Sequence, residues 1–247
     1  RLPVPTPSPN IRLITLVTTL GAALQLRRFS EPAYAIDDAW ISFRVARNLV
    51  EHGILTYNTD QAPVEGMTNL LWTLLSATWI AALPRVDPIG PARIVGALML
   101  IATIAVALPL AARLAEAAGS DPRIAAGVTG ILLVSSGSLA YHATSGLETA
   151  LWGLLATLSI SRALGEGRGP IVGIFLSLLA ITRPEGVMIG GLILGYLASR
   201  EPRRALVAAS VFGGAVLCLT LWRWGMYGQV VPNTFFAKPP WLAGGLS

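Results

Sequence analysis

Long apolar runs separated by short polar turns dominate the chain. A proline-rich lead-in covers 1–10, an apolar stretch follows over 11–26, and a long region of mixed polarity covers 27–93. Beyond it, six apolar segments follow one another at roughly 94–112, 124–141, 149–163, 171–182, 187–198 and 205–222. Runs of this length and spacing predict an all-α, polytopic membrane protein.

The positions of the arginines predict how these segments cross the membrane. Short loops rich in arginine usually face the cytoplasm, and three alternate turns carry them, over 113–123, 162–168 and 200–204. All three turns lie on the cytoplasmic side only if the chain crosses the membrane once between the mixed region and the first of these turns. The apolar stretch 68–83 is also shorter than the ~17–25 residues of a usual span, so we expect it to lie in the membrane plane. The result is seven spans, with the last outer segment at 226–247.

Composition supports a membrane protein and argues against several kinds of site. The 247 residues are 53% hydrophobic and 13% charged, with a mean hydropathy of +0.63. Soluble domains carry about 25% charged residues. The net charge of +5 comes from arginines scattered between apolar runs, which does not indicate a nucleic-acid surface. The single Cys218 excludes an internal disulfide, and the two histidines show no metal-ligand spacing.

Two adjacent acids, Asp37 and Asp38, open an amphipathic helix in the first outer region. Ile36, Ala39, Phe43, Ala46 and Val50 share its apolar side, while Asp37, Arg44, Asn48 and Glu51 share a polar side. A carboxylate there can take a proton from a hydroxyl nucleophile. An acidic cap of an ordinary surface helix is the equally weighted alternative. The shared face with Arg44 slightly favours Asp37 as the base.

Two other polar turns carry candidate binding groups. Glu65 and Asn69 lie in a turn that leads into the apolar stretch 68–83, and both suit sugar hydroxyls, although Thr68 capping a helix explains the turn as well. Glu148 lies between two predicted spans, where it is either a ligand carboxylate or a helix cap.

Charged residues close to apolar segments indicate a functional site more strongly than these turns do. Arg183 and Glu185 interrupt an apolar stretch at a Pro-Glu-Gly turn, which predicts two short helices meeting there. Buried charges in a membrane protein cost free energy unless they pair or face a polar cavity, so Arg183 is a candidate phosphate ligand. Lys238, the only lysine, follows the last span with Asn233 and several aromatic residues. An interfacial aromatic belt is the alternative there.

Taken in order, these stretches resemble the GT-C superfamily of integral-membrane glycosyltransferases, most closely the mycobacterial terminal arabinofuranosyltransferases. The residues that carry the resemblance are Asp37, Asp38, Arg44, Asn48, Val64, Glu65, 144–148, 183–185, 227–228, Val231, Pro232, Ala237 and Lys238. The resemblance implies one seven-span module with in-plane helices in the first outer loop, and further spans beyond Ser247. It also implies a polyprenyl-phosphate sugar donor, an acidic base, and either a metal-free reaction or a divalent cation (Mg²⁺ or Mn²⁺).

We therefore expect an enzyme of the plasma (inner) membrane with its site on the extracytoplasmic face. It would transfer a sugar with inversion from a polyprenyl-phosphate carrier to a hydroxyl of a glycan or protein. Asp37 or Asp38 would be the base. Arg183, Lys238 and Arg44 would hold the donor phosphate, and sugar or acceptor would be bound by Glu65, Asn69, Glu148, Glu185 and Asn233. The alternatives are a non-catalytic GT-C-like accessory subunit that binds lipid, and a transporter, whose expected internal repeat is absent from the sequence.

Overall fold

The computed structural model describes residues 9–28, 36–165 and 167–230, and all regular structure in these ranges is helical. The ten helices are α1 (Pro9–Arg28), α2 (Asp37–His52), α3 (Leu70–Ala82), α4 (Ile89–Ala117), α5 (Pro122–Ser135), α6 (Gly137–Thr144), α7 (Thr149–Leu164), α8 (Gly169–Thr182), α9 (Glu185–Arg200) and α10 (Pro202–Tyr227). The all-α prediction is therefore confirmed for this part of the chain. The expected break at Arg183 is also present, because α8 ends at Thr182 and α9 begins at Glu185.

The count of seven spans is not confirmed. Within the described ranges, α4 and α10 are long and apolar enough to cross a membrane, and α5 with α6, bent by 58° at their junction, would add a third if the pair is one span. Helices α7, α8 and α9 have 16, 14 and 16 residues, below the usual ~17–25. The apolar segments thus fold as helices close to their predicted bounds. Length separates α7, α8 and α9 from the clear spans, whereas α1, the predicted first span, has 20 residues and is still not among the candidate spans.

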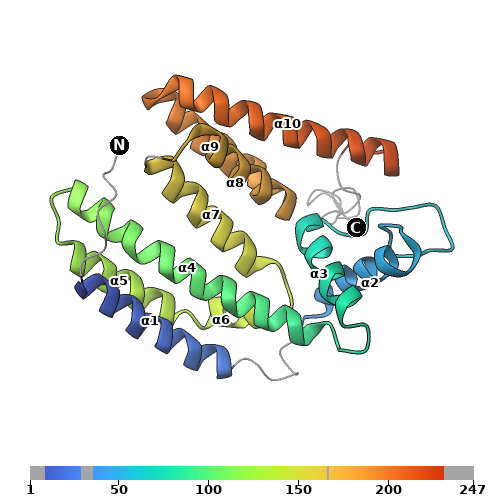
Figure 1. Ribbon diagram of the computed structural model, residues 1–247, viewed down its shortest axis with the longest axis horizontal. Helices are drawn as coiled ribbons and strands as arrows, with labels where there is room; N and C mark the ends of the chain where they lie inside the picture. The colour runs from blue at the N-terminus through green and yellow to red at the C-terminus, as the bar shows by residue number, and fades with distance from the viewer. Residues whose placement is uncertain (1–8, 29–35, 166, 231–247) are drawn as a thin grey trace, which may run out of the picture.

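The chain runs back and forth, so its polar turns gather at two opposite ends (Figure 1). Helices α2 and α3 lie together at one end, beside the start of α4 and the end of α10. The connections α4–α5, α7–α8 and α9–α10, which carry the arginine-rich turns, lie at the other end. This is the alternation that the arginine pattern predicted. Which end faces the cytoplasm stays a prediction.

The α2–α3 pair is fastened to the bundle by an apolar core. Ala39, Phe43 and Trp72 from this pair pack in one cluster with Leu151 of α7 and Leu179 of α8. The predicted apolar side of α2 is buried at its first three turns, while Val50 near its end is 40% exposed. Burying several large apolar side chains, at about 1.5–3 kcal/mol each, holds the polar first turn of α2 in a fixed place.

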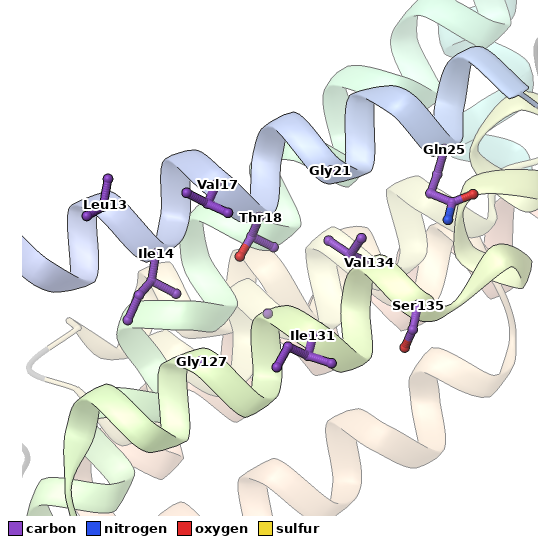
Figure 2. A pocket seen from close by; sticks show the side chains of 11 residues that line it. Leu13, Ile14, Val17, Thr18, Gly21, Gln25, Gly127, Ile131, Val134 and Ser135 are labelled. Carbon is purple, nitrogen blue, oxygen red and sulfur yellow. The ribbon is translucent and has the colours of Figure 1, made fainter.

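Glycines set how closely the other helices approach. A Cβ at Gly173 of α8 would lie 2.6 Å from the carbonyl oxygen of Ala208 in α10, and one at Gly169 would lie 2.9 Å from that of Arg204. This spacing of small residues is a common device for close packing of membrane helices. Between α1 and α5 lies a hollow of about 610 Å³, lined mainly by apolar side chains and seen in Figure 2.

Candidate functional site

The turn between α6 and α7 is the centre on which α2 and α3 converge. The backbone N–H of Ile36 donates to the carbonyl of Ser145 over 3.2 Å, and Nε1 of Trp72 donates to that of Gly146 over 2.9 Å. These bonds fix the turn against the beginning of α2 and the first turn of α3. The three segments are far apart in sequence, so the fold and not local spacing brings them together.

Gly146 is the residue that permits this convergence. Its φ is +90°, a conformation that side-chain-bearing residues rarely adopt, and a Cβ would lie 2.6 Å from Cδ1 of Ile89 and 3.0 Å from Cβ of Ala39. A larger residue would be strained at this φ and would have to displace the Ile89 side chain and press against Ala39 of α2. Gly146 therefore keeps the first turn of α2 next to Glu148.

A buried polar network occupies this junction. Oε2 of Glu148 accepts a hydrogen bond from Nδ2 of Asn69 over 2.7 Å. Oδ1 of Asn69 accepts from the hydroxyls of Ser42 and Thr73, over 3.1 and 3.2 Å. Nε of Arg183 lies 3.5 Å from Oε1 of Glu148. Helices α2 and α3 and the connections that precede α3, α7 and α9 thus contribute to one connected set, and Glu148 joins its neutral and charged parts.

Arg183 stands at the open side of the network. Its side chain is 37% exposed, whereas that of Glu148 is 8% exposed. A second ion pair joins its Nε to Oε2 of Glu185 over 3.7 Å. Both ion pairs run through Nε, and within the described ranges Nη1 and Nη2 make no hydrogen bond. Arg183 is thus oriented by carboxylates while its terminal nitrogens stay available to an anion, and pairing with Glu185 alone does not account for its position.

Helix capping, the alternative explanation for these polar residues, is not what the structure shows. Glu148 occupies the N-cap position of α7, but its carboxylate makes no capping hydrogen bond. The N-cap of α2 is Ile36, and that helix has no side-chain cap. Asn69 rather than Thr68 is the N-cap of α3, again without a side-chain cap. The side chains at these three helix starts therefore make no capping hydrogen bonds.

Asp37 and Asp38 are both exposed in the first turn of α2. Within the described ranges neither makes a hydrogen bond or ion pair. A residue i+4 lies about 40° away around a helix, so Asp38 lies on the side of Ser42 and the polar network, while Asp37 lies on the side of Ile41 and Arg44. The two aspartates therefore lie between the polar network on one side and the loop contacted by Arg44 on the other.

On the Asp37 side, Arg44 and Asn48 hold a loop against α2. Nε of Arg44 donates to the carbonyl of Tyr57 over 3.0 Å, and its Nη2 donates to Oδ1 of Asn58 over 3.3 Å. The Arg44 guanidinium also lies 4.2 Å over the centre of the Tyr57 ring. Nδ2 of Asn48 donates to the carbonyl of Thr56 over 2.8 Å. The structure thus directs Arg44 to this loop and does not bring it to Arg183.

A pocket of about 400 Å³ opens between this loop and α2. Its described lining includes Ile41, Tyr57, Asn58, Gln61 and Val64, and none of its described lining residues is charged. An aromatic ring beside carboxamides offers an apolar face and hydrogen-bonding groups to a neutral ligand. We call this the loop pocket. The sequence reading missed it, although an aromatic residue and two carboxamides between turn residues were a visible signal.

Glu65 is placed apart from the network, in a buried ion pair. Its Oε1 accepts from Nε of Arg223 in α10 over 2.8 Å, and the two residues are 3% and 8% exposed. Burial raises the pKa of Glu65 above its ordinary value, and the hydrogen bond and charge of Arg223 oppose that rise. Tyr227 donates its hydroxyl to the carbonyl of Leu55 over 2.6 Å. The sequence reading missed Arg223, a charge at the end of an apolar run that the cost of burial could have flagged.

Two of the predicted site residues, Asn233 and Lys238, lie outside the described residues. In the part of the chain that the structure describes, no group of three or more His, Cys, Asp or Glu side chains is placed to hold a metal ion.

Comparison with known proteins gives one informative similarity. The chain is 28% identical over 227 residues to the terminal beta-(1->2)-arabinofuranosyltransferase of Mycobacterium tuberculosis (strain ATCC 25618 / H37Rv). The match covers 82% of this chain and 34% of that protein's length. No family model matches the chain, and no solved structure matches it either. The chain is therefore similar, over most of its length, to about a third of an enzyme whose name agrees with the family that the ordered motifs resemble.

Proposed function

We propose that the chain is the transmembrane catalytic part of a glycosyltransferase. The observation that carries the proposal is the polar junction itself: two exposed carboxylates and a half-exposed arginine, held beside a buried network at one end of an apolar bundle. A membrane protein retains such groups at a cost unless they bind or react with something. Similarity to an arabinofuranosyltransferase supplies the reaction class.

In the proposed reaction, an acceptor hydroxyl attacks the anomeric carbon of a sugar carried on polyprenyl phosphate. The bond from that carbon to the phosphate oxygen breaks with inversion, and the phosphate leaves with the electron pair. A carboxylate takes the hydroxyl proton, a step worth about 10²–10⁴-fold in rate. The site lies at the α2–α3 end, which the arginine pattern assigns to the extracytoplasmic face.

Asp37 is our candidate for the base because of what lies on each side of the acid pair. The loop pocket is neutral and lies on the Asp37 side, where it suits a glycan acceptor presenting its hydroxyl. The network with Glu148 and Arg183 lies on the Asp38 side, where it suits the donor. Asp38 then contacts a donor sugar hydroxyl.

Arg183 is our candidate for stabilising the departing phosphate. Negative charge grows on that phosphate as the bond breaks, and a pre-oriented guanidinium stabilises it most at that stage. Glu148 and Glu185 hold Arg183 in place, while Asn69, itself bonded to Ser42, holds Glu148. Lys238 is proposed as a second phosphate ligand and Asn233 as a sugar ligand. Arg44 is proposed to shape the loop pocket, and Glu65 to anchor the segment that leads to Asn69.

The test is transfer by membranes that contain the full-length protein, assayed with a panel of labelled polyprenyl-phosphate sugars and an arabinofuranose oligosaccharide acceptor. The proposal expects labelled oligosaccharide with at least one donor and none with Arg183→Ala. The control is Thr59→Ala, which should transfer like the wild type. Thr59 is exposed in the loop that forms the loop pocket, but it is outside the pocket's described lining. No transfer with any donor would favour a non-catalytic, lipid-binding subunit instead.

A further inference from the structure

The other end of the bundle holds a basic hollow that the transfer reaction does not use. Helices α8 and α10 begin there, and the hollow between their first turns has a volume of about 430 Å³. Its charged lining residues in the described ranges are Arg168, Arg203 and Arg204. We call it the basic pocket.

The backbone brings two helix N-termini to this pocket. Both helices have a proline in their first positions and no side-chain cap, so their first N–H groups and positive dipole ends are not satisfied by a local carboxylate or hydroxyl. The close approach depends on Gly169, whose missing Cβ avoids the carbonyl oxygen of Arg204 and the side chain of Val207. Helix N-termini are common anion sites, although they do not make one alone.

The second observation is the state of Arg204. Its side chain is only 10% exposed, and Nε is buried without a hydrogen-bond partner. Nη1 donates to Oε1 of Glu201 over 3.0 Å, and Nη2 donates to the carbonyl of Arg162. Two of its three nitrogens are therefore fixed by the fold, and the third is a buried donor on a residue that lines the pocket. An unsatisfied buried donor of this kind costs about 1–3 kcal/mol unless a ligand accepts from it.

The other two arginines leave the pocket strongly positive. Arg168 and Arg203 are exposed, and within the described ranges neither makes a hydrogen bond or ion pair. In the part of the chain that the structure describes, one of these three arginines forms an ion pair with a carboxylate, Arg204 with Glu201. Three guanidinium groups beside two helix N-termini match a phosphate group better than a carboxylate or a neutral ligand.

We propose that the basic pocket binds a phosphate group, supplied by the headgroup of an anionic phospholipid. Its position favours a lipid, because the pocket lies at the ends of apolar helices, at the level where headgroups meet a membrane protein. It is distinct from the proposed donor site, since the start of α2 and the connection between α8 and α9 lie at the opposite end of the bundle (Figure 1). The proposal therefore stands whether or not the chain transfers sugar.

The test uses the full-length protein in a neutral detergent, titrated with phosphatidylglycerol and followed by native mass spectrometry, with inorganic phosphate as a competitor in a second arm. Arg204→Gln would break the ion pair with Glu201 and risk misfolding, so the informative variant is Arg168→Gln/Arg203→Gln, at two exposed positions. The matched control is Arg123→Gln/Arg200→Gln, which removes the same charge from exposed positions at the same end but outside the described lining.

The proposal expects the pocket variant to bind phosphatidylglycerol at least about tenfold more weakly than wild type, and the control to stay within about twofold. Competition by millimolar inorganic phosphate would show that the phosphate group suffices, and lack of competition would show that the lipid supplies further contacts. Equal weakening in both double variants would mean diffuse attraction to a basic surface and would overturn the proposal. Failure of the wild type to bind either probe would overturn it too.

Discussion

The buried pair of Glu65 and Arg223 gives the prediction that the structure supports most quantitatively. Replacing Arg223 by Met keeps an elongated side chain but leaves the carboxylate of Glu65 buried at 3% exposure without its cation. Removing one member of a buried ion pair costs about 3–5 kcal/mol. For a chain of this size each kcal/mol shifts the unfolding midpoint by about 2–4 °C, so Arg223→Met should unfold about 6–20 °C below wild type at pH 8.

The loss in Arg223→Met should depend on pH with a definite sign. Burial raises the pKa of Glu65, and removing Arg223 takes away the groups that oppose the rise, so the pKa in the folded variant rises further. A raised folded-state pKa gives stability that is present below the unfolded pKa, about 4–4.5, and is lost as the pH rises through the folded-state value. The deficit relative to wild type should therefore shrink between pH 8 and pH 5.

Tryptophan fluorescence during heating, in detergent at pH 5 and pH 8, measures this directly. The double variant Glu65→Gln/Arg223→Met should lose the pH-dependent part of the deficit. Arg85, exposed in the turn after α3, provides the control Arg85→Met, which should differ from wild type by less than about 0.5 kcal/mol. A deficit in Arg223→Met below about 1 kcal/mol, or one equal at both pH values, would refute the reasoning.

Three further predictions concern the junction and the loop pocket. Gly146→Ala should cost about 1–3 kcal/mol in unfolding free energy, because φ is +90° and the new Cβ would meet Ile89; an unchanged midpoint would contradict this. Glu148→Gln should raise the KM for the lipid-linked donor about 10–100-fold by weakening the hold on Arg183, and a change within twofold would count against the network's role. Tyr57→Ala should raise the acceptor KM about tenfold while Tyr57→Phe stays near wild type, and steady-state kinetics giving equal values for both would exclude the ring as a platform.

Local sequence signals predicted the helices well. Apolar runs bounded by Pro, Gly and Arg turns predicted segments close to the observed ones, and the chain breaks at Arg183 and Pro184 between α8 and α9 as expected. Local signals could not decide which helices span, because that depends on length near a threshold and on neighbours. The span count therefore stays open for α1, α7, α8 and α9.

The candidate site was predictable residue by residue but not as a geometry. The sequence singled out Asn69, Glu148 and Arg183 separately, each with a plausible structural explanation. Their connection spans 79 residues between Asn69 and Glu148, and the partner Ser42 is an ordinary polar residue in sequence. Such long-range pairs follow from helix packing, so no local pattern could reveal them. The same holds for Glu65 and Arg223, which are 158 residues apart.

The transfer activity of Asp37→Asn and Asp38→Asn, measured side by side in membranes, tests the central claim most directly. Asparagine keeps the shape of the side chain but cannot accept the proton, so Asp37→Asn should lower transfer about 10²–10⁴-fold at unchanged protein level. Asp38→Asn should retain measurable transfer with a raised donor KM. Loss only in Asp38→Asn would exchange the two roles. Full activity in both variants would contradict an aspartate base at the start of α2.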